Sequence, residues 1–359
     1  MSVNATLKKL CSLPGVSGQE DAVREYLLRA LEGRADCACR VDALGNLIVE
    51  KTGRNTPAKK LLLTARLKGR QQAPHRVLFA AHMDEVGLMV TGITDDGYLR
   101  FTTVGGIDSR VLFARRVRVN GHAGVIGGKA THQCTKQEKE TPPDAARLLI
   151  DLGCDSREEA EKIAAPGDVA VFDSGYEKLG GGLFSARALD DRAGCALLLS
   201  LAEETPAYDI TLAFTVQEEV GLRGAGAVAF AVQPELAVVV DATTAADTAG
   251  VPAERQVCRQ GKGAVLSFMD KRTLYDRPLY EYITALAEKE NLPVQPKTVV
   301  AGGNDAGAIQ LTGAGCRVAA ISLPCRYIHS PACALRKEDL RDTLALLRLL
   351  RDRLPAAGV

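Results

Sequence analysis

The sequence predicts an α/β protein with a mostly parallel sheet covered by helices, into which a β-rich domain is inserted. Short apolar runs that could form buried strands alternate with amphipathic helical segments, which is typical of a largely parallel sheet with helices on both faces. Between residues 86 and 172, short β-type runs separated by Gly or polar residues replace this pattern. We therefore expect a discontinuous α/β domain of residues 1–85 and 173–359, and an inserted β-rich domain of residues 86–172.

The part of the α/β domain before the insertion predicts two helices and three strands. The first helix is expected at residues 4–13. Ser17 and Glu20 have the spacing of a capping box, so a second helix is expected to begin there and to end near Leu31. The strands are expected at residues 47–51, 60–65 and 76–81.

The insertion predicts a series of short strands, at residues 88–91, 98–104, 111–119, 125–130 and 168–172. The polar segment 131–144 contains Pro142 and Pro143, and we expect it to form an exposed, mobile loop.

The α/β pattern returns after residue 190. Further strands are expected at residues 210–216, 236–240 and 318–323, and helices at residues 193–204, 278–290 and 339–354. With the strand before the insertion, these segments complete the expected sheet.

The composition argues against several classes of protein. The chain has 45 basic and 44 acidic residues, so its net charge of +1 offers no reason to expect nucleic acid or an anionic membrane as partner. It has no run of about 18 apolar residues that could span a membrane, and its start lacks the apolar stretch of a signal peptide. The ten cysteines have irregular spacing, and we expect them to be reduced in a cytoplasmic protein.

Four of the expected strands lead into residues that can bind a metal. These residues are His82, the pair Glu218-Glu219, Asp241 and His329. Ligands of open α/β sheets bind beyond the carboxyl ends of the strands, so these side chains are expected to share one crevice. Asp190, just before a helix, would be a further member of the group.

Two histidines and three carboxylates suit Zn²⁺, Co²⁺ or Mn²⁺. Five ligands are too many for one tetrahedral ion with an open position, so we expect two divalent ions per subunit, about 3.5–4 Å apart. His82 and Asp241 would hold one ion, Glu219 and His329 would hold the other, and Asp190 would bridge them.

Two further carboxylates are the expected catalytic residues. Asp84 stands two positions beyond His82 and could orient its imidazole. Glu218 adjoins the ligand Glu219, yet its own carboxylate can stay free. We therefore expect Glu218 to act as general base, and then as general acid to the leaving amine.

Eight motifs resemble those of the tetrahedral, or TET, aminopeptidases, which are glutamyl- and leucyl-aminopeptidase-like di-metal exopeptidases. They are GVSGQE (15–20), LGNLI (44–48), AHMDEVG (81–87), ALDDRAG (188–194), FTVQEEVGLRGA (214–225), VVDAT (239–243), AGAI (306–309) and RYIHSP (326–331). The motifs are spread over nearly the whole chain, and together they are highly specific.

The resemblance implies a phosphorylase/hydrolase-like catalytic domain and an inserted PDZ-like or β-barrel dimerisation domain. It implies an aminopeptidase in which Glu218 is the base to a metal-bridged hydroxide. The implied metals are a Zn²⁺ or Co²⁺ pair. The implied assembly is a tetrahedral dodecamer that takes peptides rather than folded proteins. The metal ligands implied by the motifs are His82, Asp190, Glu219, Asp241 and His329.

Several alternatives stay open at this point. An amidohydrolase or deacylase on the same scaffold would need the same ligands. A glycoside hydrolase would need two carboxylates and no metals, and a non-catalytic protein would tolerate loss of a ligand or of the base; the intact set argues against both. Gly303-Asn304-Asp305 could line a substrate pocket or form a tight turn before a helix. Arg223 could bind an acidic side chain of the substrate or form a structural ion pair.

Overall fold

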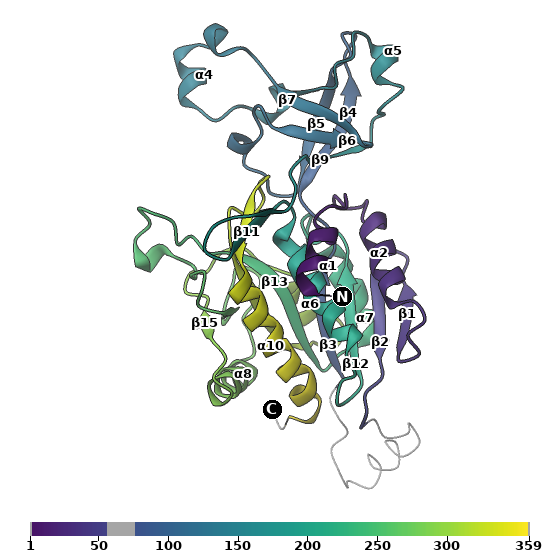
Figure 1. Cartoon of the computed structure of the whole chain (residues 1–359), viewed down its shortest axis with the longest axis vertical. Coiled ribbons are helices and arrows are strands. Elements are labelled where there is room, and N and C mark those ends of the chain that lie inside the picture. Colours follow the sequence, from purple (N-terminus) through teal and green to yellow (C-terminus); the bar gives the residue numbers. More distant parts are fainter. Residues whose placement is uncertain (1, 56–75, 358–359) are drawn as a thin grey trace.

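The protein consists of an α/β domain and a closed β-barrel that stands beyond one end of the α/β domain (Figure 1). The computed structural model describes residues 2–55 and 76–357. The sheet and barrel confirm the predicted fold class. The boundaries placed at residues 85/86 and 172/173 stay a prediction, and the strand expected at residues 60–65 lies outside the described residues.

The centre of the large sheet is parallel and its borders are antiparallel. Strands β12 (Ile210–Thr215), β3 (Val77–His82), β13 (Leu236–Thr244) and β16 (Arg317–Arg326) lie side by side in parallel. The antiparallel borders are β1 (Cys37–Val41) and β2 (Leu47–Lys51) on one side, and β17 (Cys333–Arg336), β11 (Leu183–Ala186) and β10 (Glu177–Lys178) on the other. A short strand β14 (Ala264–Leu266) pairs with β16 and with β15 (Val294–Pro296).

Helices cover both faces of the sheet, because its central strands carry apolar side chains on both sides. Phe79 packs into one core, whereas its neighbours Leu78 and Ala80 pack into the other, as the two-residue period of a strand requires. The first core includes α1 (Val3–Leu10), α2 (Asp21–Leu31), α6 (Leu189–Glu203), α8 (Arg277–Lys289) and α10 (Lys337–Arg353). The second core includes α7 (Arg223–Val232) and α9 (Ala306–Gln310). Within residues 2–55 and 76–357, no helix is both long and apolar enough to cross a membrane.

The barrel has its own apolar core and contains six strands in the order β4-β5-β8-β7-β6-β9. The strands are β4 (Gly87–Ile93), β5 (Leu99–Val104), β6 (Arg116–Val119), β7 (His122–Gly127), β8 (Leu149–Asp151) and β9 (Val169–Phe172). Two short helices, α4 (Lys136–Glu140) and α5 (Arg157–Ala160), lie between its strands in the sequence. The structure therefore confirms a β-rich insertion and shows that it closes into a barrel.

Some predicted element boundaries are wrong. Ser17 and Glu20 do not form a capping box: α2 begins at Asp21, and the hydroxyl of Ser17 donates a hydrogen bond to Asp84 instead. In a capping box the Ser17 oxygen would accept a hydrogen bond from a backbone N–H, whereas here its hydroxyl donates a charge-assisted hydrogen bond to the buried carboxylate of Asp84.

Two predictions for the insertion are also wrong in part. The strand expected at residues 111–119 is reduced to β6, because Ala114 adopts a positive φ of 61° and interrupts the extended backbone. Segment 131–144 is exposed as predicted, but it contains the helix α4. This helix begins at a capping box formed by Thr135 and Glu138.

Candidate active site

The predicted site residues gather at the carboxyl ends of the parallel strands. β12 pairs with β3 as far as the pair Thr215–His82, whereas β13 pairs with β3 only as far as Val239–Ala80. The ladder between β3 and β13 therefore ends just before His82 and Asp241. Asp241 lies inside β13, three positions before its end at Thr244, and not beyond the strand as expected.

The first cluster of side chains consists of His82, Asp190 and Asp241. His82 Nε2 is 3.2 Å from Asp190 Oδ1 and 3.7 Å from Asp241 Oδ1. The ligand atoms of the three residues lie within 4.8 Å of one another, and all three residues are buried. This spacing is suited to a shared cation.

The second cluster consists of Asp190, Glu219 and His329. His329 Nε2 is 3.4 Å from Asp190 Oδ2 and 3.3 Å from Glu219 Oε1. Asp190 thus directs one carboxylate oxygen to each cluster, which is the arrangement of a bridging ligand. Its position follows from the irregular start of α6, where Asp190 and Asp191 have non-helical φ and ψ.

Glu218 lies beside both clusters. One carboxylate oxygen of Glu218, one of Glu219 and a ring nitrogen of His82 lie within 4.8 Å of one another. Glu218 is therefore close enough to act on a molecule held at the site.

Asp84 holds several parts of the site together. Its Oδ1 accepts a hydrogen bond from the Glu218 amide at 3.0 Å and lies 3.4 Å from His82 Nδ1. Its Oδ2 accepts hydrogen bonds from the Glu219 amide at 3.1 Å and from Ser17 Oγ at 2.6 Å. Burial alone would raise the pKa of Asp84. The hydrogen bond with His82, the positive charge of His82, and the hydrogen bonds from Ser17 and the Glu218 amide together lower that pKa. Asp84 therefore stays ionised in a fully buried position.

The turn that carries Glu218 and Glu219 is held by two N-terminal residues that the sequence reasoning missed. Glu20 Oε1 accepts a hydrogen bond from the Gln217 amide at 3.1 Å, and Asn46 Oδ1 accepts one from the Val216 amide at 2.9 Å. Gln217 itself has a positive φ of 57°, so this turn needs such support. The signal that could have identified Asn46 is a polar residue in the otherwise apolar motif LGNLI.

Negative charge is in excess at the site. Burial raises the pKa of Glu218 well above its usual range, and the nearby carboxylates of Asp241 and Glu219 add to this effect. Burial would lower the pKa of His82, but hydrogen bonds to Asp190 and Asp241 raise it well above its usual range. Positive charge would relieve this imbalance.

The residues present fit a pair of divalent cations. Apart from His329 Nε2 at 3.3 Å, the buried Glu219 Oε1 has no hydrogen-bond partner among the described residues, although buried oxygens are normally satisfied. The two imidazoles and three carboxylates provide the nitrogen and oxygen donors that Zn²⁺, Co²⁺ and Mn²⁺ accept.

The structure shows where the segment Gly303-Asn304-Asp305 and Arg223 lie, whose roles the sequence left open. Asp305 precedes α9, is buried, and accepts a hydrogen bond from Thr215 Oγ1 at 2.5 Å, so the segment forms the turn before a helix. Burial raises the pKa of Asp305 to about 7. Arg223 is exposed at the start of α7, and no carboxylate of residues 2–55 or 76–357 lies within ion-pair distance of it.

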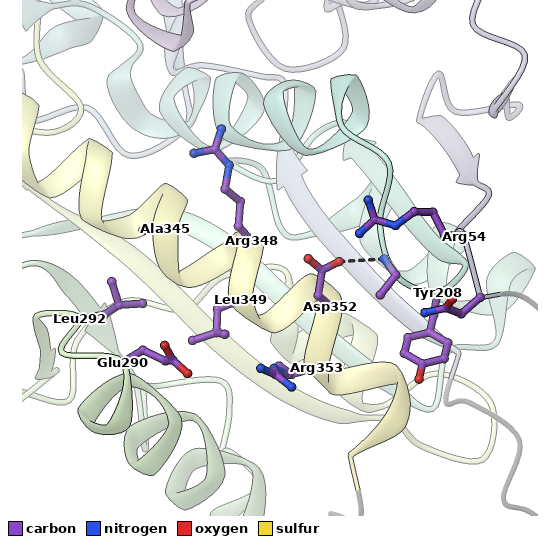
Figure 2. Close-up of a pocket in the computed structure, with 11 residues that line it drawn as sticks. Arg54, Tyr208, Glu290, Leu292, Ala345, Arg348, Leu349, Asp352 and Arg353 are labelled. Carbon is purple, nitrogen blue, oxygen red and sulfur yellow. Dashed lines mark hydrogen bonds between the residues drawn. The ribbon is translucent and has the colours of Figure 1, made fainter.

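A large cavity lies at the opposite end of the sheet. It has a volume of about 590 Å³ and is lined by Arg54, Tyr208, Arg348 and Asp352, among others (Figure 2). Asp352 Oδ1 accepts a hydrogen bond from the Ala207 amide in this cavity at 2.8 Å. Tyr208 precedes β12, whereas Glu218 follows it, so this cavity is at the amino ends of the parallel strands. Active sites of such sheets lie at the carboxyl ends.

The sequence matches a known family over most of its length. The profile of the M42 glutamyl aminopeptidase family matches residues 62–346. A putative aminopeptidase of Acetivibrio thermocellus is 37% identical over 343 residues, which cover 95% of this chain and 96% of that protein. The lysyl aminopeptidase of Pyrococcus furiosus is 31% identical, with 97% of this chain and 96% of that protein covered.

Solved structures that resemble this chain are also those of peptidases. The aminopeptidase APDkam598 of Desulfurococcus kamchatkensis is 32% identical and has a TM-score of 0.88, with 98% of this chain and 94% of that chain covered. The TET1 peptidase of Pyrococcus horikoshii, which can assemble into a tetrahedron or a large octahedral shell, is 36% identical, with a TM-score of 0.82 and coverage of 98% and 99%. The chain therefore belongs to the M42 glutamyl aminopeptidase family, and it is a metal-dependent aminopeptidase.

Proposed function

We propose that the enzyme uses two divalent metal ions at the two clusters described above. His82 and Asp241 would hold one ion, Glu219 and His329 the other, and Asp190 would bridge them. The observation that carries this proposal is the orientation of Asp190, with Oδ1 3.2 Å from His82 Nε2 and Oδ2 3.4 Å from His329 Nε2. Zn²⁺ or Co²⁺ is the proposed metal, and Mn²⁺ also suits these donors.

In the proposed reaction, Glu218 moves the proton. When bound, a metal pair would polarise the scissile carbonyl and lower the pKa of a water molecule. Glu218 then accepts the proton of the attacking water and donates it to the nitrogen of the leaving amine. Burial is the first cause that raises the pKa of Glu218 well above its usual range, and a raised pKa makes the carboxylate a stronger base.

Asp84 supports this chemistry through His82. Its carbonyl oxygen lies 3.1 Å from His82 Nδ1, and its Oδ1 lies 3.4 Å away. Two acceptors at Nδ1 keep the imidazole proton on that nitrogen, so the lone pair of Nε2 faces Asp190 and Asp241.

The proposed substrate is a peptide with a free N-terminal amino group. The test is a panel of aminoacyl chromogenic substrates beside their N-acetylated counterparts, with chelator added and Zn²⁺, Co²⁺ or Mn²⁺ then restored. We expect hydrolysis of the free-amine series only, loss of activity with chelator, and recovery with metal. Preferential hydrolysis of the N-acetylated series would instead favour the alternative, a di-metal deacylase. Full activity after metal removal would overturn the proposal.

We further propose that the chain forms dimers through the inserted barrel, and that the dimers assemble into a tetrahedral dodecamer. The support is the likeness to the TET1 peptidase, whose solved structures include a dodecamer. Light scattering tests this proposal, and a monomer at working concentration would contradict it. That the enzyme acts in the cytoplasm stays a prediction from the sequence.

A further inference from the structure

A two-glycine loop of the barrel lies against the second cluster of the site. The loop is Gly105-Gly106, which directly follows β5. The carbonyl oxygen of Gly106 is 2.9 Å from Nδ1 of His329, a residue 223 positions further along the chain. The barrel therefore contacts a proposed metal ligand of the α/β domain directly.

Gly105 has no room for a side chain at this contact, whereas a Cβ atom on Gly106 would just reach van der Waals contact with the His329 ring. A Cβ atom on Gly106 would lie 3.4 Å from His329 Nδ1, and one on Gly105 would lie 3.3 Å from the Cβ of Glu219. Gly105 also has a positive φ of 80°, and its Cβ would meet Val86 Cγ1 at 2.7 Å. Both proposed ligands that are specific to the second ion, Glu219 and His329, thus border this loop.

The contact determines how His329 presents its ring. A backbone carbonyl can only accept a hydrogen bond, so Nδ1 of His329 carries a proton, and the proton that a metal would displace is the one on Nε2, which faces Asp190 and Glu219. The His329 side chain is 30% exposed, whereas that of His82 is 3% exposed, so packing restrains His329 less. The two histidines also differ in the residue that orients them. His82 is oriented by Asp84, which lies two positions further along the same segment, whereas His329 is oriented by Gly106 of the insertion.

The segment that leaves the barrel contacts the loop between β16 and β17, which carries His329, at a second point. Ser174 Oγ, just beyond β9, donates a hydrogen bond to the carbonyl oxygen of Pro331. A cavity of about 500 Å³ beside the Gly106 contact is lined by Gly106, Val111 and Arg115 of the insertion and by residues 327–332 of this loop. The loop that carries His329 is therefore contacted at two points, by Gly106 and by Ser174.

We infer that the inserted barrel completes the second metal position, with the Gly106 carbonyl as the group that orients His329. This inference rests on the proposed two-ion site and adds a positioning role for the insertion that is separate from subunit contacts. A displaced supporting partner of a ligating histidine weakens metal binding by about 10- to 100-fold, and we expect an effect of that size on one ion only.

The test compares two matched pairs of glycine substitutions in the full-length enzyme. Gly106→Val places a branched side chain against the His329 ring, and Gly127→Val is its control, because a Cβ at Gly127 meets no atom within 4 Å. Gly105→Ala is paired with Gly121→Ala, since these glycines have similar positive φ values of 80° and 83° but a Cβ at Gly121 also meets nothing within 4 Å. Gly106→Ala is a milder variant, in case the valine prevents folding.

The readout is the dissociation constant of each Zn²⁺ ion, measured by calorimetric titration of the metal-free protein. We expect Gly106→Val and Gly105→Ala to weaken one ion by about 10- to 100-fold while the other ion binds as in wild type, with a smaller effect for Gly106→Ala. Both controls should bind two ions normally, and circular dichroism should show folded protein throughout.

The outcomes separate this inference from the proposed function. If the wild type does not bind two ions, the proposed two-ion site fails. If the wild type binds two ions and the Gly105 and Gly106 variants match their controls, or lose both ions equally, the positioning role of the barrel is overturned.

Discussion

Single residues at the site serve more than one partner at once. Asp84 uses both carboxylate oxygens, so that one residue fixes the ring of His82 and the backbone at Glu218 and Glu219. Asp190 likewise divides its two oxygens between the two histidines. Replacing either carboxylate by a group with only one acceptor oxygen should therefore disturb several contacts together.

Glu218→Gln should abolish most of the activity and leave metal binding intact. The amide has nearly the same shape as the carboxylate, but it cannot accept the proton of the attacking water. General base catalysis contributes about 10²- to 10⁴-fold, so kcat should fall by that factor while two metal ions remain bound. Steady-state kinetics and metal analysis measure the two quantities. Near-normal turnover would rule out Glu218 as the base.

Asp84→Asn should weaken metal binding and lower stability. Each oxygen of Asp84 faces at least one N–H donor, so the amide nitrogen of Asn meets a donor in either orientation. A buried unpaired donor costs about 1–3 kcal/mol, and loss of a supporting partner of a ligating histidine costs about 10- to 100-fold in metal affinity. Urea unfolding and metal titration check both effects. The control Asp95→Asn changes a carboxylate that is 93% exposed and should behave as wild type; an unchanged Asp84→Asn would contradict the role given to this residue.

At the scale of elements, the turn between β12 and α7 depends on Asn46, a polar residue that directly precedes β2. Asn46 Oδ1 accepts a hydrogen bond from the Val216 amide, and Asn46 Nδ2 donates one to the carbonyl of Gly224 at 3.2 Å. The helix begins tightly against this side chain, so Gly224 must lack a Cβ. The position of Glu218 and Glu219 thus depends on close packing between three elements.

Gly224→Ala should destabilise the protein, whereas Gly226→Ala in the same helix should not. A Cβ at Gly224 would lie 2.3 Å from Asn46 Oδ1 and 2.5 Å from the Val216 carbonyl oxygen, while one at Gly226 meets only Thr312 Oγ1 at 3.9 Å. Overpacking of this kind costs about 1–3 kcal/mol. Alanine in place of a helical glycine with free space gains roughly 0.5–1 kcal/mol.

Urea unfolding of the two metal-loaded variants measures these free energies. Equal stability of Gly224→Ala and Gly226→Ala would show that the close contact with Asn46 does not constrain the turn.

At the scale of the whole molecule, a sheet, a barrel and an N-terminal segment converge on one crevice of excess negative charge. The N-terminal segment provides Ser17 and Glu20, the barrel provides Gly106, and the sheet, the loops that follow its strands and the start of α6 provide the proposed ligands. Metal-free protein must tolerate this charge by keeping protons that the unfolded chain releases.

Metal-free protein should lose stability as pH rises from about 7 to about 9. Burial would lower the pKa of His329, but hydrogen bonds to Asp190 and Glu219 raise it to about 12, above the ordinary value of 6.5. The folded state then retains a proton that the unfolded chain loses above pH 6.5, so this stabilisation is full below that value and is lost as pH rises toward 12. The raised pKa of His82 acts in the same direction.

Denaturant midpoints at fixed protein concentration, with and without Zn²⁺, test this expectation. Bound metal should protect more strongly at the higher pH, because protons compete with it for the same atoms. A metal-free protein whose stability rises over this range would contradict the charge balance described above.

The sequence by itself determined the α/β class, the β-rich insertion and the set of proposed ligands. It could do so because strand ends are local features: an apolar run that stops at His82 or at Glu218 is visible without knowing what lies beside it. The same reasoning failed where a side chain had both a local and a distant partner. Ser17 and Glu20 have the spacing of a capping box. In the fold, however, Ser17 donates a hydrogen bond to Asp84, and Glu20 accepts one from the Gln217 amide.

Only the tertiary structure decided how the site is held. Asn46 supports the turn at Val216, and the barrel loop reaches His329 across 223 positions of the chain. Such contacts depend on the order of the strands in the sheet and on the position of the barrel. Neither the spacing of residues within a motif nor the periodicity of apolar residues indicates which distant segments come together. The kinds of atom at the site follow from the local sequence, whereas their orientation follows from long-range packing.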